Sequence, residues 1–188
     1  MRARAGVARR AARQLLDELG GLGDGGPPVD VHRAARWCGL SVVFDRFDGD
    51  TSGLLWRHHD GTRVVGVNSA HPASRQRFTI AHEIGHALLH LGDDEHGGTG
   101  GDDVFIDKPR EVLFRDAVSS RATDPREIEA NAFAAELLMP AALVRPAFDE
   151  QVREATAERL VRLLADRFGV STTAMAYRLV NLGLMDPA

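Results

Sequence analysis

The feature that most constrains this chain is a short polar motif inside an apolar helix. Residues 82–86 read His-Glu-Ile-Gly-His, and the apolar residues around them recur at helical spacing. A helix that is apolar over most of its surface belongs to a core, so His82, Glu83 and His86 need partners in or beside buried surface. The apolar residues of this helix are Phe78, Ile80, Ala81, Ile84, Ala87, Leu88, Leu89 and Leu91.

The spacing of the two histidines favours a metal site. Histidines four residues apart project from one helical face, so both imidazoles can reach one Zn²⁺ at about 2.0–2.1 Å. Glu83 points in a neighbouring direction, from which it can reach a water held on the metal. The alternative is a helix with two surface histidines and a salt-bridging glutamate, which the apolar surroundings disfavour. Gly85 costs about 1 kcal/mol in mid-helix relative to alanine, and this indicates close packing there.

A catalytic zinc site needs a third protein ligand, and a second predicted helix, which begins at Asp124, offers one. On a helical wheel, Glu127 and Asn131 lie on or beside the apolar face. Glu129 and Glu136 fall on the opposite side, where we expect them to face water. This pattern favours Glu127 as a metal ligand and Asn131 as a hydrogen-bond partner of a ligand histidine. The alternative role of Glu127 is local, as part of a capping motif that starts at Asp124.

Two further residues are candidates for the site. His90 lies four residues beyond His86 and could ligate the metal, but a histidine near a helix C-terminus interacts well with the helix dipole. We therefore expect His90 to have that structural role. Tyr177, the single tyrosine, is a candidate for stabilising the transition state, although a helical tyrosine more often packs in a core.

The order of the predicted elements indicates an α+β fold. Residues 3–19 have helical spacing, and Asp30 can cap a short second helix. Asp60-Gly61 is a strong hairpin signal between two strand-like runs. We expect a small antiparallel sheet packed on the motif-bearing helix, with an extended substrate pairing with an edge strand from residues 53–69. The three strand-like runs are 41–47, 53–59 and 62–68.

Composition sets broad limits on the class of protein. The 188 residues fit one compact domain, and a net charge of −4 gives no general attraction to nucleic acid or an anionic membrane. The single cysteine, Cys38, excludes an internal disulfide, so we expect a cytoplasmic protein. No run approaches the roughly 20 apolar residues of a membrane span. The arginine-rich start lacks the apolar segment of a secretory signal, and we expect it to form a surface helix with a solvated basic face.

Residues 92–124 form a long, acidic and glycine-rich stretch in which only 104–106 and 112–114 have an ordered pattern. Segments of this kind are usually functional lids or disordered, so this stretch is a candidate lid that keeps the site closed.

Two further helices are expected near 155–168 and 172–182, and they resemble a helix-turn-helix. Between residues 151 and 188, five arginines and four acidic residues leave a net charge of +1, which is a poor footprint for phosphate binding. Direct DNA binding is therefore disfavoured. We expect the two helices to pack as a cap on the core through an apolar stripe of Leu160, Leu163, Leu164 and Phe168.

Residues 75–90 resemble the core motif of the ImmA/IrrE-type metallopeptidases, and residues 127–140 resemble the second motif of that family. Residues 27–31, Pro-Pro-Val-Asp-Val, and Ser52-Gly53 also fit, so the resemblance covers most of residues 27–140. It implies a zincin-like peptidase core in which His82, His86 and Glu127 bind zinc. It also implies that Glu83 is the catalytic base.

The resemblance further implies a function. Members of the family are bacterial or phage proteins that typically cleave a helix-turn-helix repressor, which relieves repression in stress responses or mobile-element control. The expected partner is thus a DNA-binding repressor as protein substrate, with no membrane involved. We expect an N-terminal helix and linker at 1–26, the peptidase core at 27–148 and the C-terminal cap at 149–188.

Two alternatives stay open. Mn²⁺ or Fe²⁺ could occupy a site of two histidines and one carboxylate, because affinity alone does not decide which metal is loaded. The chain could also be a DNA-binding or protein-binding regulator that uses its helix-turn-helix-like segment, with a metal site that is structural or only conditionally active.

Overall fold

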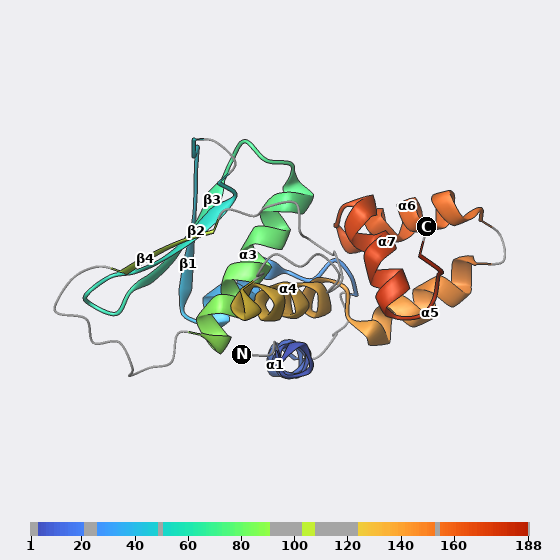
Figure 1. The fold of residues 1–188 in the computed structure, drawn as a ribbon, viewed down its shortest axis with the longest axis horizontal. Coiled ribbons are helices and arrows are strands. Elements are labelled where there is room, and N and C mark those ends of the chain that lie inside the picture. Colours follow the sequence, from blue (N-terminus) through green and yellow to red (C-terminus); the bar gives the residue numbers. More distant parts are fainter. Residues whose placement is uncertain are drawn as a thin grey trace.

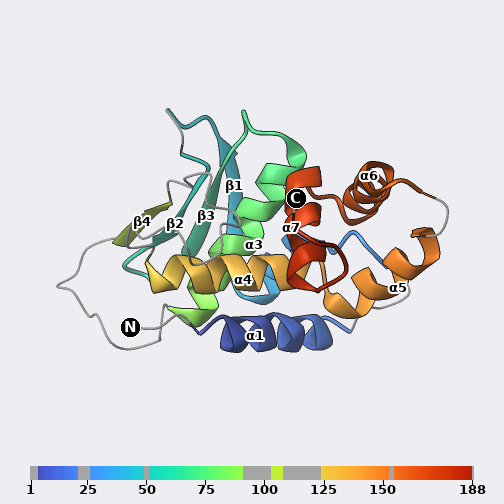
Figure 2. The ribbon, with the colours of Figure 1, turned by 45° about the vertical axis from the view of Figure 1, so that its right-hand side comes forward.

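The computed structural model describes residues 4–20, 26–48, 51–90, 103–107, 124–152 and 155–187. In Figures 1 and 2, the sheet lies at one end of the molecule and the C-terminal helices lie at the other, with the remaining helices beside and between them. The expected α+β class is confirmed. The elements are α1 Ala5–Glu18, α2 Val31–Trp37, β1 Leu40–Asp45, β2 Gly53–Arg57, β3 Arg63–Asn68, α3 Ala73–Leu89, β4 Asp103–Asp107, α4 Pro125–Leu138, α5 Ala141–Gln151, α6 Ala157–Phe168 and α7 Thr172–Asn181.

The sheet is mixed, with the strand order β1-β3-β2-β4. β2 and β3 form the expected hairpin, in which Gly61 takes a positive φ of 86° and its backbone nitrogen donates to the carbonyl of His58 at 3.0 Å. β1 lies beside β3 and runs parallel to it, so the expectation of an antiparallel sheet is wrong for this pair. The reason is that β3 inserts between β1 and β2, which run in opposite directions but are not neighbours.

β4 covers an edge of β2 that would otherwise be free to pair with a substrate. It pairs antiparallel with β2 over the whole length of that strand, with Asp107 opposite Gly53. β2 and β3 are therefore both inner strands, and the expectation that a substrate pairs with an edge strand from 53–69 is wrong for this sheet. β4 includes the expected ordered run at 104–106. The run at 112–114 and the rest of the candidate lid up to residue 123 lie outside the described residues.

α1 packs along α4, as both ribbon views show. Val7 is 42% exposed, while small alanines of this helix turn inward. The expectation of a surface helix with a solvated basic face is confirmed, since Arg9, Arg10 and Arg13 are exposed. Arg13 stays half-exposed while it contacts Glu136 at 3.2 Å. The buried side chains are Ala8, Ala12, Leu15 and Leu16 of the helix and Leu19 after it.

α4 is therefore buried on two sides, which corrects the placement of two glutamates. Glu129 and Glu136 are 8% and 2% exposed and do not face water. Glu129 accepts a hydrogen bond from the backbone nitrogen of Arg4 at 2.6 Å, and Glu136 contacts Arg13 and Arg178. The helical wheel identified the apolar face of α4 correctly, but a wheel cannot show that a second helix covers the polar face.

The C-terminal helices dock on the end of α4. Arg178 on α7 is 3% exposed, donates from Nε to the carbonyl of Met139 at 2.9 Å and pairs with Glu136. The expected stripe on α6 is buried except for Leu163, which is 41% exposed. α5 was not expected from the sequence, because Pro140 and Pro146 interrupt its pattern. Pro140 in fact stands just before its first residue, a position where proline is tolerated.

None of the described helices is long and apolar enough to cross a membrane.

α3 and α4 cross at Gly85, where the expected close packing is found. A Cβ at this position would lie 3.2 Å from the Cα of Ala130 and 3.2 Å from the Cβ of Phe133. The two helices could not approach as closely with any larger residue here. Gly85 therefore sets the separation between the helices that carry the candidate metal ligands.

We predict that Gly85→Ala destabilises the fold. The added methyl group must push α4 away, at a cost of about 1–3 kcal/mol for overpacking, which exceeds the ~1 kcal/mol gain in helix propensity. Gly6→Ala on the exposed side of α1 is the matched control, because its Cβ would meet only the Arg10 side chain, at 3.8 Å. Denaturant unfolding should show Gly6→Ala as neutral or stabilising. Equal effects of the two variants would contradict the prediction.

We also predict that Arg178→Ala is strongly destabilising. It leaves Glu136 buried with only the half-exposed Arg13 beside it, and breaking a buried pair costs about 3–5 kcal/mol. Arg167→Ala is the control, because the contact between Arg167 and Glu150 is solvent-exposed and such pairs contribute about 0–1 kcal/mol. The free energies of unfolding of both variants, compared with wild type, measure the difference.

Candidate metal centre

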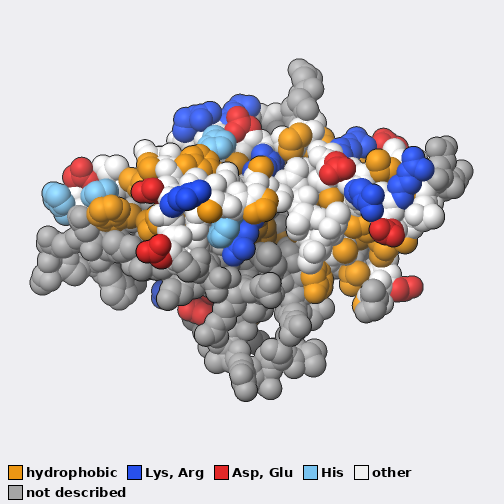
Figure 3. Space-filling view, turned by 90° about the horizontal axis from the view of Figure 1, so that it is seen from above, with side chains coloured by type: hydrophobic (Ala, Val, Ile, Leu, Met, Phe, Trp, Pro, Cys, Tyr) orange, Lys and Arg blue, Asp and Glu red, His pale blue; other side chains and the backbone are white. Residues whose placement is uncertain are grey.

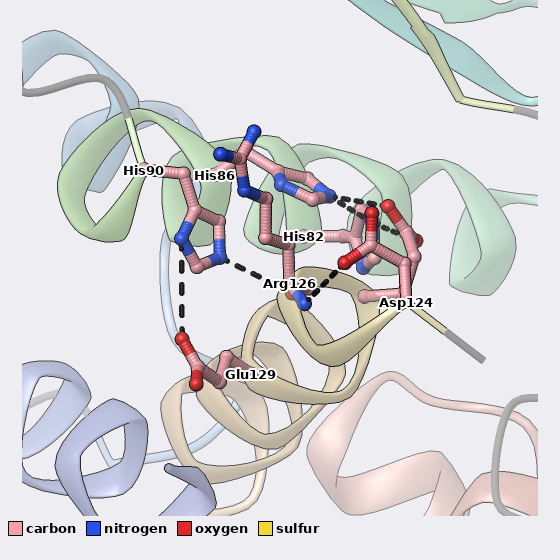
Figure 4. A network of polar contacts seen from close by, with 7 residues as sticks. His82, His86, His90, Asp124, Arg126 and Glu129 are labelled. Atoms are coloured by element: carbon pink, nitrogen blue, oxygen red, sulfur yellow. Dashed lines mark hydrogen bonds and ion pairs between the residues drawn. The ribbon is translucent and has the colours of Figure 1, made fainter. Parts of the chain in front are cut away.

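The candidate centre combines one face of α3 with the first turn of α4. His82 and His86 lie one turn apart on α3, and their Nε2 atoms approach to 2.9 Å. Glu127 reaches across from α4, with its carboxylate oxygens 3.3 Å from His82 Nε2 and 3.1 Å from His86 Nε2. Figure 4 shows His82 and His86 on α3, next to the first turn of α4 that carries Asp124 and Arg126. The structure thus brings together the three side chains that were expected to be ligands.

This geometry fits a tetrahedral metal ion. Ligand atoms about 2.0–2.1 Å from such an ion lie roughly 3.3 Å from one another, close to the three separations found here. Two imidazole nitrogens and a carboxylate oxygen form the only group of potential metal ligands found within the described part of the chain, with all atoms within 4.8 Å. A metal ion between these three atoms would be bound by lone pairs that converge at these distances. The donor set is one that zinc commonly uses.

The electrostatics of the centre keep its carboxylate charged. Hydrogen bonding to His82, and then to His86, holds the pKa of Glu127 well below its usual value, and this outweighs the opposing effect of burial. Glu127 is therefore an anion throughout the physiological pH range. A carboxylate ligand must be ionised to bind a metal. Glu127 is therefore in the protonation state that metal binding requires.

Glu83 lies deeper than the ligands, on the side of α3 that faces β2. It is 1% exposed. A Cβ on Gly53 would lie 3.6 Å from its Oε1 and would also collide with the side chain of Thr79. β2 can pass this close to α3 only because residue 53 has no side chain. Ser52, beside Gly53, is buried and accepts a hydrogen bond from Arg75 Nε at 2.9 Å, which holds β2 against the helix.

The remaining candidates are not brought into the ligand group. Asn131 is half-buried, and among the described residues its side chain makes no hydrogen bond to either ligand histidine. Tyr177 is 37% exposed on α7, whose inner face docks at the opposite end of α4, so its suggested role stays a prediction. His90 contacts α4 at the carbonyl of Arg126 and lies outside the group of three.

Cys38 is poorly suited to nucleophilic catalysis. Burial raises the pKa of the Cys38 thiol to about 11, so this thiol stays protonated at neutral pH and is a poor nucleophile.

Comparison with known proteins gives two named relatives. The chain is 33% identical over 177 residues to "Radiation response metalloprotease IrrE" of Deinococcus deserti, covering 93% of this chain and 56% of that protein. It is 36% identical over 134 residues to the protein of the same name from Deinococcus radiodurans, covering 68% of this chain and 35% of the relative. The chain thus spans about half, or less, of the length of these relatives.

Among solved structures, a "Mycobacterium tuberculosis transcriptional regulator" shares the fold, with a TM-score of 0.56 and 24% sequence identity. The match covers 92% of this chain and 46% of that one.

The family model described as the IrrE N-terminal-like domain, peptidase M78, matches residues 38–180. This range is well over half of the chain and includes both helices that carry the candidate ligands. The chain therefore belongs to the family of IrrE N-terminal-like domains, the M78 peptidases.

Proposed function

We propose that this chain is a zinc-dependent endopeptidase, with His82, His86 and Glu127 as the zinc ligands and Glu83 as the catalytic base. The observation that carries the proposal is the convergence of two imidazoles and one carboxylate from two helices, with a fourth buried side chain beside them. Membership of the M78 peptidase family supports the same reading. Mn²⁺ or Fe²⁺ is the alternative metal for this donor set.

In the proposed hydrolysis, the metal, Glu83 and Glu127 have different roles. Zn²⁺, when bound, supplies Lewis acidity, which lowers the pKa of water and polarises a peptide carbonyl. Glu83 accepts the proton of the attacking water and delivers it to the leaving amine. Glu83 suits this role by its position, because it directly follows the ligand His82 on α3 and lies buried, away from bulk water. Glu127 stays ionised and takes no part in proton transfer.

We extend the proposal to the substrate, which would be a helix-turn-helix repressor whose cleavage relieves repression in a stress response or in the control of a mobile element. The support is the resemblance to the ImmA/IrrE-type peptidases. The names of the two relatives, which describe radiation response metalloproteases, are in line with a stress-related role.

A DNA-binding or protein-binding regulator is the second candidate function, since α6 and α7 are joined by the tight turn expected of a helix-turn-helix. The buried Arg178 ties α7 to α4, which favours a cap on the core. On the face shown in Figure 3, basic and acidic side chains are interspersed over the end that carries these helices. A gel shift on DNA that persists in the presence of a chelator would favour this second function.

The first prediction from this proposal concerns metal content. Wild-type protein should contain about one zinc per chain by elemental mass spectrometry, whereas His86→Ala and Glu127→Ala should contain little, because each removes one of three ligands. Glu158→Ala, on the exposed surface of α6, is the control and should retain zinc. Zinc retained in Glu127→Ala would assign the third ligand elsewhere, and the same measurement shows whether manganese or iron is loaded instead.

The second prediction separates the base from the ligands. Glu83→Gln keeps the size of the side chain, so its zinc content should match wild type. Its rate of repressor cleavage should fall by at least about 100-fold, the lower end of what a positioned general base contributes. The rate is measured by gel electrophoresis of a helix-turn-helix repressor with and without chelator. Wild-type cleavage that is insensitive to the chelator would contradict the mechanism.

A further inference from the structure

We propose that His90 is a positioning residue, which holds the first turn of α4 so that Glu127 can reach the two ligand histidines. The inference rests on the proposed metal site and adds to it a residue that binds no metal. Figure 4 shows the arrangement, with the ring of His90 extending from the end of α3 to the first turn of α4.

The first contact joins His90 to the residue before the ligand. His90 Nε2 lies 3.2 Å from the backbone carbonyl oxygen of Arg126, which directly precedes Glu127. A neutral ring that carries its proton on Nε2 donates to this carbonyl.

The ring also lies beside a buried carboxylate. His90 Nδ1 lies 3.9 Å from Oε2 of Glu129, a glutamate that is 8% exposed. This distance is too long for a hydrogen bond, and Nδ1 carries no proton in a neutral ring that donates through Nε2. The contact that joins His90 to the ligand helix is therefore the one between Nε2 and the first turn of α4.

The position of Glu127 explains why such an anchor matters. Its side chain is 38% exposed, so surrounding atoms do not enclose it, and it lies in the first turn of its helix, where the backbone has fewer internal hydrogen bonds. Asp124 caps this turn by accepting from the nitrogen of Arg126 at 2.9 Å. That cap stabilises the turn but does not connect it to α3, where the ligand histidines are.

His86 and His90 make that connection together. His86 lies in the last turn of α3 and His90 directly follows the helix, and their ring centroids are 5.3 Å apart. His86 contacts the carboxylate of Glu127, while His90 contacts the carbonyl one residue earlier. The two rings therefore hold the same turn of α4, one through a side chain and one through the backbone. Gly85 fixes the separation of the helices nearby, but a packing contact does not orient this turn.

The test compares two amide substitutions of His90 in the full chain. The amide of His90→Gln reaches the place of Nε2 and can donate to the Arg126 carbonyl, whereas the shorter amide of His90→Asn reaches only the place of Nδ1. Zn²⁺ affinity is measured by competition with a chromogenic chelator, and Co²⁺ is added separately so that its visible spectrum reports the geometry of the ligands. His59→Asn, on the exposed hairpin turn, is the control.

We expect His90→Asn to bind Zn²⁺ at least about tenfold more weakly, as is usual when a residue that orients a metal ligand is lost, and to shift the Co²⁺ bands. His90→Gln and His59→Asn should stay close to wild type in both measurements, and the melting temperatures of the metal-free His90 variants should be similar. Unchanged affinity in His90→Asn, or equal losses in both His90 variants, would overturn the inference.

Neither measurement uses a substrate, so a protein that binds zinc but cleaves no repressor leaves this inference standing and removes only the proposed activity. A wild-type chain that binds neither metal would remove the metal site and the inference together.

Discussion

The crossing of α3 and α4 at Gly85 is the contact on which the rest of the site depends. The two histidines are on one helix and the carboxylate is on the other, so a short side chain such as glutamate bridges the gap only where the helices lie close. Gly85 permits this, with Ala130 and Phe133 of α4 packed directly against it. The same requirement recurs on the other side of α3, where Gly53 lets β2 approach Glu83. Two glycines thus determine how near the neighbouring elements come to the motif-bearing helix.

α4 shows how partners decide the role of a carboxylate. Its three glutamates are all at least partly buried, yet each has a different partner. Glu127 faces two imidazoles, Glu129 faces a backbone nitrogen and His90, and Glu136 faces two arginines. A buried carboxylate is tolerated only when it is paired or hydrogen-bonded. Glu136 therefore fastens α1 and α7 to the helix, Glu129 fastens the start of α1 to it, and Glu127 is left for the metal.

These partners also explain what could be predicted from sequence. His82, His86 and Glu83 were identified because helical spacing is local, and the hairpin was identified because Asp60-Gly61 dictates its own turn. The burial of Glu129 and Glu136 was missed because it depends on α1, more than a hundred residues earlier. The parallel pairing of β1 was missed because strand order follows from contacts that no local pattern records.

The strand order of the sheet limits where an extended substrate can pair relative to Glu83. Gly53 is the point at which β2 comes closest to Glu83, and β4 holds the strand position opposite it, with Asp107 as the partner. Neighbouring strands lie about 4.8 Å apart. A peptide that added to the outer edge of β4 would thus lie roughly two strand spacings, or about 10 Å, from β2. β1 is likewise separated from β2 by β3. An extended substrate can therefore pair beside Glu83 only when β4 leaves β2, so that strand binding by the substrate and the pairing seen here exclude each other.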